Sequence, residues 1–338
     1  IETLLHDFDA SYEFVGNRQG EFWFLTDRDA PRRRLIGIAI DRPEPGEWRE
    51  IVAEDAATLE DVLAVPDGFI ARYLEDAHNR LDCYAVDGTH VRTLPLPGLG
   101  TVAEIRGRSD DSEAFYSFTS FTEAPAVYRY DTGSGEATLF RRAIPQIESD
   151  TYQTRQIFYE SRDGTRVPMF LIHRRDLSPD RPHPVLLYGY GGFNISLTPT
   201  FAPSRIAWLE MGGVYAVANI RGGGEYGEDW HQAGICRNKQ NGIDDFISAA
   251  EWLIGSGYTN SERLAITGGS NGGMLVGACI TQRPDLFAAA VPAVGVMDLL
   301  RFHKFTIGWA WTSDYGSPDD PDDFPALRAC SPYHNIRE

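Results

Sequence analysis

The sequence predicts a mostly parallel α/β sheet with helices on both faces, preceded by part of an all-β propeller. Three observations lead to this prediction. Up to about residue 142, short β-rich segments follow one another between turn signals, whereas apolar strands alternate with helical stretches in the rest of the chain. The length of 338 residues also exceeds the usual size of one domain. We therefore expect two domains, a partial propeller over residues 1–149 and the α/β domain over residues 150–338.

The N-terminal region repeats at the spacing of propeller blades. Aromatic strands begin at Phe22, Phe69 and Phe115, at intervals of 47 and 46 residues. A second strand follows each of them, at residues 35–40, 81–86 and 126–130. Repeats of about 40 to 50 residues with four short strands each are typical of β-propellers, and a β-sandwich is the alternative. About three blades do not close a ring, so we expect the rest of the propeller before Ile1.

The C-terminal region shows the alternation of an α/β sheet. A hairpin over residues 156–173 comes first, with its turn at Asp163 and Gly164. Apolar strands are then predicted at residues 185–188, 214–220, 264–267 and 288–294, and helices at residues 243–254 and 274–280. Strands that alternate with helices indicate a largely parallel sheet covered by helices. The change of pattern places the domain boundary near residues 148–152.

A glycine-rich turn marks the candidate nucleophile. The strand at residues 264–267 runs into the segment GGSNGG and then into a helix, so that Gly268, Ser270 and Gly272 match the pattern G-x-S-x-G. At such an elbow the helix N-terminus directs free N–H groups toward an oxygen that becomes negative. A glycine-rich turn with a capping serine is the alternative. The context favours an α/β-hydrolase domain with Ser270 as its nucleophile.

A second glycine-rich loop, with the sequence YGYGGF, follows the strand at residues 185–188. The α/β-hydrolases build their other oxyanion donor at this position. In this chain the hydroxyl group of Tyr190 is a candidate donor in place of a backbone N–H. A tight turn with a packed aromatic side chain is the alternative.

A third glycine-rich segment resembles a dinucleotide-binding motif. Gly222, Gly224 and Gly227 spell G-x-G-x-x-G after an apolar strand, and Asp244 follows about 20 residues later, as a dinucleotide site requires. However, Glu225 would place a carboxylate in the pyrophosphate cradle, and no clear amphipathic helix begins at Gly227. We therefore do not expect this segment to bind a nucleotide.

Charge, cysteine spacing and hydropathy narrow the choice of partners and compartment. The chain has 49 acidic and 31 basic residues, and its net charge of -18 repels nucleic acid phosphates and anionic lipids. Its four cysteines show no CxxC spacing, which argues against a zinc site or a dense disulfide framework and favours a reducing compartment. No apolar run reaches the roughly 18 residues that a membrane span needs. The start lacks a Met and a signal-peptide pattern, so we expect a longer or processed natural chain.

Four segments carry a family resemblance. They are residues 188–194 (YGYGGFN), 218–227 (ANIRGGGEYG), 268–273 (GGSNGG), and 302–308 (FHKFTIG) leading into 311–315 (WTSDY). Over residues 152–337 the sequence resembles the prolyl oligopeptidase family, whereas the N-terminal region resembles it only in its blade spacing. The resemblance implies a serine endopeptidase that cleaves short peptides after proline, with a seven-bladed propeller that excludes folded proteins. It implies no cofactor, and we expect no metal, no nucleic acid or membrane partner, and a monomer. The cytoplasm is the expected location, with the periplasm or secretion as the alternative.

The resemblance also implies a set of site residues. These are Ser270 as nucleophile, the Asn271 backbone N–H and the Tyr190 hydroxyl as oxyanion donors, Trp311 as the platform for the proline ring, and Tyr315, Val296 and Phe193 as lining of the substrate pocket. An indole suits this role because its flat apolar face matches a ring that offers little to hydrogen bond. Without the family, Trp309 and Trp311 are equivalent candidates, and at strand spacing they would face opposite ways.

The sequence provides no clear base for Ser270. A hydrolase of this fold orders its triad Ser, Asp, His, and only His303 and His334 follow the serine. Both match segments that the family does not use for its base, and we interpret both as structural. The aspartate-rich segment 317–324 is interpreted as a solvated loop, rather than a Ca²⁺ site or the source of the triad acid. The catalytic Asp and His, and the family's remaining substrate-binding arginine, are expected beyond Glu338.

Three other functions remain open from the sequence. A lipase or esterase would share the elbow without needing an aromatic slot for proline. A propeller protein without catalytic activity would bind peptides without turning them over. A macrocyclising or transpeptidating enzyme would form the same acyl-enzyme, and only analysis of the products distinguishes it from a hydrolase.

The chain from Ile1 to Glu338, expressed by itself, is expected to be inactive on a prolyl-amide substrate. Without a base the serine hydroxyl stays protonated, and general-base assistance typically contributes about 10² to 10⁴-fold. The assay compares this chain with the full-length protein. Robust hydrolysis that disappears with Ser270→Ala would contradict the prediction and assign the base to His303 or His334.

Overall fold

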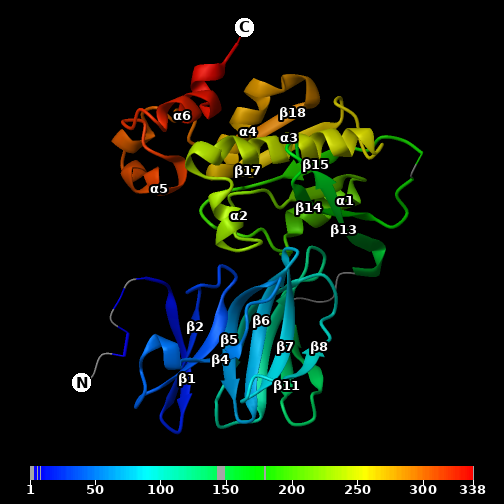
Figure 1. The fold of residues 1–338 in the computed structure, drawn as a ribbon. Coiled ribbons are helices and arrows are strands. Elements are labelled where there is room, and N and C mark those ends of the chain that lie inside the picture. Colours follow the sequence, from blue (N-terminus) through cyan, green and yellow to red (C-terminus); the bar gives the residue numbers. More distant parts are fainter. Residues whose placement is uncertain (1–3, 6, 8, 143–148, 179, 338) are drawn as a thin grey trace. The chain divides into compact units, whose positions relative to one another are not determined.

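The computed structural model describes residues 4, 5, 7, 9–142, 149–178 and 180–337. The chain divides into two compact units, residues 1–147 with 198–201, and residues 148–197 with 202–338 (Figure 1). The predicted boundary begins at Glu148, which lies outside the described residues.

The first unit contains three antiparallel sheets of four strands each, and it confirms the prediction of propeller blades. The first sheet comprises β1 (Tyr12–Arg18), β2 (Glu21–Thr26), β3 (Arg34–Ala39) and β4 (Arg49–Val52). The second comprises β5 (Thr58–Val65), β6 (Gly68–Glu75), β7 (His78–Ala85) and β8 (His90–Leu94). The third comprises β9 (Thr101–Gly107), β10 (Glu113–Thr119), β11 (Ala126–Asp131) and β12 (Ala137–Arg142).

Each blade buries its inner strands against the next blade. The indole of Trp23 on β2 meets the ring of Phe69 on β6 edge to face, with 4.8 Å between centroids. A second cluster joins Leu81 on β7 to Val102 on β9 and Tyr116 on β10. The two strands that the sequence predicts in each repeat are the inner strands of the blade. Some of the missed outer strands are mostly exposed and carry little apolar periodicity, such as β12, in which all residues but the first are exposed.

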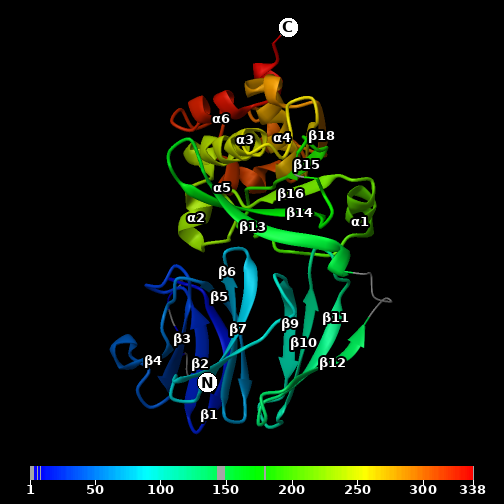
Figure 2. The ribbon, with the colours of Figure 1, turned by 90° about the vertical axis from the view of Figure 1, so that its right-hand side faces the viewer.

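The second unit is built on one mixed sheet with the strand order β13-β14-β16-β15-β17-β18 (Figure 2). Its strands are β13 (Tyr152–Glu160), β14 (Arg166–Arg174), β15 (Val185–Tyr188), β16 (Val214–Ala218), β17 (Leu264–Gly269) and β18 (Ala289–Ala293). The hairpin β13–β14 and the pair β14–β16 are antiparallel, and the other pairs are parallel. The predicted, mostly parallel sheet is therefore confirmed. Its centre is fully apolar, since all five residues of β16 are buried.

The helices of this unit are α1 (Pro203–Glu210), α2 (Glu228–Gln232), α3 (Lys239–Gly255), α4 (Asn271–Gln282), α5 (Thr312–Tyr315) and α6 (Phe324–Cys330). Short 3₁₀ helices are η1 (Pro45–Glu47) in the first unit and, in the second, η2 (Ser149–Thr151), η3 (Cys236–Asn238), η4 (Pro284–Leu286), η5 (Phe302–Lys304), η6 (Gly308–Trp311) and η7 (Tyr333–Asn335). The two predicted helices correspond to α3 and α4, and each begins three or four residues earlier than the apolar pattern indicated. No helix in the described part of the chain is long and apolar enough to cross a membrane.

The segment with two indoles is not extended. Trp309 and Trp311 both lie in the 3₁₀ helix η6, so the expectation that strand geometry turns them to opposite faces was wrong. The two still differ in burial, because the Trp309 side chain is largely exposed while Trp311 packs against the core of the unit.

The buried guanidinium group of Arg221 connects three parts of this unit. Nη2 of Arg221 donates a hydrogen bond of 2.6 Å to Oδ1 of Asp245 on α3, and Nη1 donates one of 2.6 Å to Asp163 in the β13–β14 turn. The Arg221 side chain is almost fully buried and Asp245 completely so. The pKa of Asp163 is lowered to about 2, mainly by its hydrogen bond with Arg221. Because an unpaired charge is costly in such surroundings, the pair fixes the loop that follows β16.

This loop carries the dinucleotide-like motif and holds Glu225 in its interior. Oε1 of Glu225 accepts hydrogen bonds from the Leu197 N–H at 2.9 Å and from Nδ2 of Asn219 at 3.2 Å, while Oε2 is buried without a partner among the described residues. Burial raises the pKa of Glu225 to about 7. A helix, α2, follows Gly227, but it has only five residues and buries none of them, so it is not the amphipathic helix that a dinucleotide site would need. The carboxyl group occupies the loop, as the sequence suggested.

We predict that Glu225→Gln stabilises the protein at pH 8 but not at pH 4. The pKa of Glu225 is higher in the folded state (about 7) than its ordinary value of 4.5. The contribution of this group to folding stability is therefore fully present below about pH 4.5 and is lost as pH rises through 7. The neutral amide removes this loss, which amounts to about 3 kcal/mol above pH 7. Urea unfolding at both pH values measures it, with the exposed Glu262→Gln as control. The same difference at pH 4 and pH 8 would contradict the prediction.

Candidate active site

Ser270 lies at a sharp turn between β17 and α4. Its backbone has φ 56° and ψ -117°, a conformation that residues other than glycine rarely adopt. The Ser270 N–H donates a hydrogen bond of 2.9 Å to the carbonyl oxygen of Ala293, and its own carbonyl accepts from the N–H groups of Gly273 and Met274. The strained turn leaves Ser270 exposed at the N-terminus of α4, as expected for a nucleophile elbow.

The turn requires glycine on both sides of the serine. A Cβ atom on Gly268 would lie 2.4 Å from the carbonyl oxygen of Gly272, and a Cβ on Gly272 would lie 2.5 Å from that of Gly189. Both obstacles are backbone atoms, which cannot rotate away as a side chain can. The G-x-S-x-G pattern therefore reflects a close approach of the strand, the helix and the loop after β15.

Strand pairing brings the loop with Tyr190 to the same edge as Ser270. Tyr188 at the end of β15 pairs in parallel with Thr267 on β17, so both chains leave the sheet side by side. The phenol of Tyr190 lies close enough to Ser270 for the serine side chain to influence its pKa. Burial raises the pKa of Tyr190 and the nearby Ser270 side chain only partly opposes this rise, so the phenol stays protonated at neutral pH. It is therefore available as a hydrogen-bond donor beside the nucleophile.

Asn271, the first residue of α4, contacts the loop that carries Tyr190. Its side chain is buried, and Nδ2 donates a hydrogen bond of 2.5 Å to the carbonyl oxygen of Tyr190. As the first residue of a helix, Asn271 has no acceptor within the helix for its backbone N–H. The structure thus places Ser270, Tyr190 and Asn271 together.

The four predicted pocket residues pack around one apolar cluster. The rings of Phe193 and Tyr315 meet edge to face with 5.7 Å between centroids, and Tyr315 is almost completely buried. Burial raises the pKa of Tyr315, so its hydroxyl stays neutral. Trp311 and Val296 are partly buried and pack against the same core. The structure brings Phe193 and Tyr315 into direct contact and places Trp311 four residues before Tyr315.

The two histidines after Ser270 have partners elsewhere. Nε2 of His303 lies 3.1 Å from Oδ2 of Asp319, and Nδ1 of His334 lies 2.8 Å from Oγ of Ser331. The aspartate-rich loop is more engaged than the sequence indicated, since Asp323 accepts hydrogen bonds from Nε of Arg237 and the Ser317 N–H. Among the described residues no group of three or more His, Cys, Asp or Glu side chains is arranged to hold a metal ion.

A buried charge cluster beside the predicted pocket residues escaped the sequence analysis. Asp314, Lys239 and His231 come from three separate elements and meet behind Tyr315. Asp314 stands in the segment WTSDY, which drew attention only through its aromatic residues. Nothing in the local sequence marks Lys239 or His231, because their significance depends on long-range contacts.

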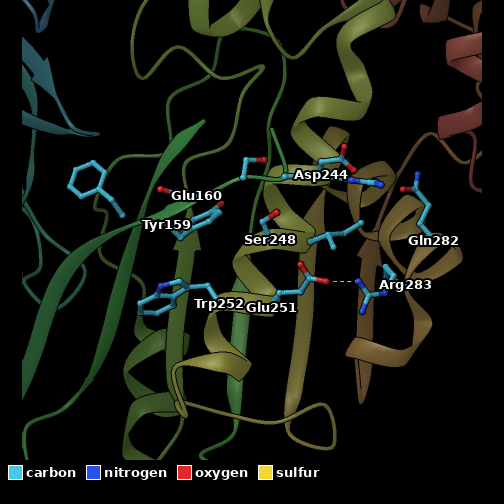
Figure 3. Close-up of a pocket in the computed structure, with 12 residues that line it drawn as sticks. Tyr159, Glu160, Asp244, Ser248, Glu251, Trp252, Gln282 and Arg283 are labelled. Carbon is cyan, nitrogen blue, oxygen red and sulfur yellow. Dashed lines mark hydrogen bonds and ion pairs between the residues drawn. The ribbon is translucent and has the colours of Figure 1, made fainter. Parts of the chain in front are cut away.

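A large pocket lies apart from these residues. It has a volume of about 850 Å³ and is lined by residues of β13, α3 and the segment after α4, and none of the predicted site residues lines it (Figure 3). Glu251 and Arg283 form an ion pair at its edge.

Comparison with known proteins relates both units to one family. The model of the prolyl oligopeptidase family matches residues 199–338. The model of the prolyl oligopeptidase N-terminal beta-propeller domain matches residues 1–143. The chain is 39% identical over 335 residues to the prolyl endopeptidase of Elizabethkingia meningoseptica. This alignment covers 99% of this chain and 47% of that protein.

Solved structures show the same relationship. A prolyl endopeptidase structure matches with a TM-score of 0.92 and 45% identity, over 99% of this chain and 49% of that one. Prolyl oligopeptidase B from Galerina marginata, bound to a 25mer macrocyclization substrate, matches with a TM-score of 0.93 and 34% identity, over 99% and 47% of the two chains. The chain spans about half the length of the relatives it matches. The two domain models, the identity and the shared fold together show that the chain belongs to the prolyl oligopeptidase family.

Proposed function

We propose that this chain supplies the nucleophile, the oxyanion donors and the substrate pocket of a serine endopeptidase that cleaves short peptides after proline. The observation that carries the proposal is the elbow itself, with Ser270 held at φ 56° beside the phenol of Tyr190. A serine that only capped a helix would need neither the positive φ nor the tyrosine. Both features suit a hydroxyl that must attack a carbonyl group.

In the proposed reaction the Ser270 oxygen forms a bond to the carbonyl carbon of the substrate's proline. Its proton passes to a general base, which a serine nucleophile requires at neutral pH. The peptide C–N bond then breaks, and the departing amine takes up that proton. Water attacks the resulting ester with help from the same base, which releases the peptide acid and restores the serine.

Two donors are proposed to stabilise the oxyanion of the tetrahedral intermediate. One is the hydroxyl of Tyr190, which burial keeps protonated. The other is the backbone N–H of Asn271 at the positive end of the α4 dipole. Donors that are already oriented before reaction stabilise the developing charge without reorganisation. The Asn271 side chain contributes indirectly, because its bond to the Tyr190 carbonyl fixes the loop.

Specificity for proline is assigned to the aromatic cluster. Trp311 would stack on the pyrrolidine ring, while Phe193, Tyr315 and Val296 would line the slot. The partly exposed rings of Trp311 and Phe193 offer an apolar surface to a ring that lacks hydrogen-bonding groups, and the buried ring of Tyr315 supports Phe193 from behind. Relatives named prolyl endopeptidase, 39% identical to this chain, support the assignment.

Macrocyclisation is the second candidate function. The structure of prolyl oligopeptidase B with a macrocyclization substrate is as similar in fold as that of the endopeptidase. In that reaction the amino group of the bound peptide, instead of water, attacks the acyl-enzyme. Mass spectrometry of the products separates the two functions, since a cyclic product is lighter than the hydrolysed acid by one water molecule. The esterase and the non-catalytic binding protein lack a comparable supporting observation, and the monomeric state and the cytoplasmic location stay predictions from the sequence.

In the full-length protein, Ser270→Ala is expected to abolish peptide hydrolysis and leave the fold intact, because only the attacking oxygen is lost. A residual rate of about 10³ to 10⁴ over water is expected from binding and oxyanion stabilisation. Turnover of a prolyl-amide substrate and circular dichroism measure the two effects. Activity equal to that of the parent protein would refute the assignment of Ser270.

Trp311→Ala is expected to weaken cleavage after proline selectively. The lost ring contact is worth roughly 0.5 to 1.5 kcal/mol beyond the buried area. The ratio kcat/KM is compared for two matched peptides with Pro or Ala before the scissile bond, and Trp309→Ala, at the exposed indole, is the control. If both peptides lose kcat/KM by the same factor, Trp311 is not the proline platform.

A further inference from the structure

A carboxylate that the proposed chemistry does not use lies behind the substrate pocket. Asp314 precedes the pocket residue Tyr315 on α5 and is only 2% exposed. A buried carboxylate is costly unless donors and an opposite charge compensate it. The partners that compensate Asp314 therefore indicate its role.

Three donors from three different segments converge on this carboxylate. Oδ1 accepts a hydrogen bond of 2.7 Å from the backbone N–H of Phe193 and lies 3.1 Å from Nε2 of His231 on α2. Oδ2 accepts a hydrogen bond of 2.8 Å from Nζ of Lys239 at the start of α3. Asp314 thus joins the loop after β15 to α2, α3 and α5.

Lys239 is the third member of the cluster and contacts Tyr315 and Gly191 as well as Asp314. Its side chain is 3% exposed, and its ammonium group lies 4.9 Å from the ring centroid of Tyr315 and 3.4 Å from the carbonyl oxygen of Gly191. Burial lowers the pKa of Lys239, and the nearby Asp314 opposes this effect. The ion pair therefore contacts the Tyr190 loop at two points, the Gly191 carbonyl and the Phe193 N–H.

The loop held at these points is strained. Phe193 and its neighbour Asn194 both have φ 56°, in the left-handed region that residues with side chains seldom occupy. Such a conformation persists only when surrounding contacts enforce it. The short bond from Phe193 to Asp314 is one such contact, and the bond from the Asn271 side chain to the Tyr190 carbonyl is another.

We propose that Asp314 is a positioning residue, which acts through the loop at residues 190–193 to hold the Tyr190 hydroxyl at Ser270. The same contacts fix that loop to the helix that carries Tyr315, so that the oxyanion donor and the pocket wall keep one relative position. This inference rests on the proposed function, in which Tyr190 stabilises the oxyanion. A misplacement of about 1 Å in such a group can cost about 10²-fold in rate.

The test is a double-mutant cycle on kcat in the full-length protein, under conditions where the chemical step limits the rate. Tyr190→Phe by itself is expected to lower kcat by about 10² to 10³-fold, as for the loss of one oxyanion donor. Asp314→Ala is expected to lower kcat by about 10- to 100-fold in the parent protein. In the Tyr190→Phe background it should lower kcat by less than about 3-fold, because residues that act as a unit are not additive.

Two further variants separate positioning from general stability. Asp314→Asn keeps an oxygen for the Phe193 N–H, so its loss of kcat should be smaller than that of Asp314→Ala. Asp323→Asn removes another carboxylate that accepts from a backbone N–H and an arginine but does not contact the loop, and it should leave kcat unchanged in both backgrounds. If Asp314→Ala does not fold, the cycle is run with Asp314→Asn and the same criterion of non-additivity.

The outcomes distinguish this inference from the proposed function. An equal loss of kcat from Asp314→Ala in both backgrounds would overturn the positioning role alone, since the effect would then be independent of Tyr190. An unchanged kcat in Tyr190→Phe would refute the oxyanion role of Tyr190 and the positioning role with it.

Discussion

The candidate site depends on a close approach of three backbone segments. The elbow after β17, the start of α4 and the loop after β15 meet where any side chain on Gly268 or Gly272 would collide with a carbonyl oxygen. Because backbone atoms cannot move aside, only glycine permits this contact. The approach brings Ser270 at φ 56° beside the hydroxyl of Tyr190. The proposed roles of Ser270 as nucleophile and Tyr190 as oxyanion donor follow from that juxtaposition.

Buried charges hold the segments that the glycines bring together. Arg221 joins the loop after β16 to α3 and to the β13–β14 turn, and Asp314 joins the Tyr190 loop to three helices. In both cases the charged group is almost fully buried and has partners on several elements. Removing one member would leave another charge without compensation, so such clusters fix relative positions more than they add net stability. Rigid support of this kind suits loops whose own backbone is strained.

Local patterns were sufficient for the fold class and for Ser270. Apolar residues located β15, β17 and the central part of α3, because the strands lie in the core of the sheet and one face of the helix is buried. It missed the outer blade strands and α1, whose sequences are more polar and whose structure depends on neighbouring elements. The 3₁₀ helix around Trp309 and Trp311 was also missed, since a short segment with alternating large side chains does not reveal its own backbone geometry.

The sequence by itself determined the order of the two domains, the glycine pattern of the elbow and the identity of the candidate nucleophile, because these depend on residues close together in the chain. The family likeness, also readable from short segments, added Tyr190, Asn271 and the aromatic pocket residues. Only the tertiary structure decided that the Tyr190 hydroxyl reaches Ser270, and that Asp314, Lys239 and His231 form one buried cluster. These contacts join residues more than 70 positions apart, and their energies arise from burial and pairing that no local pattern records.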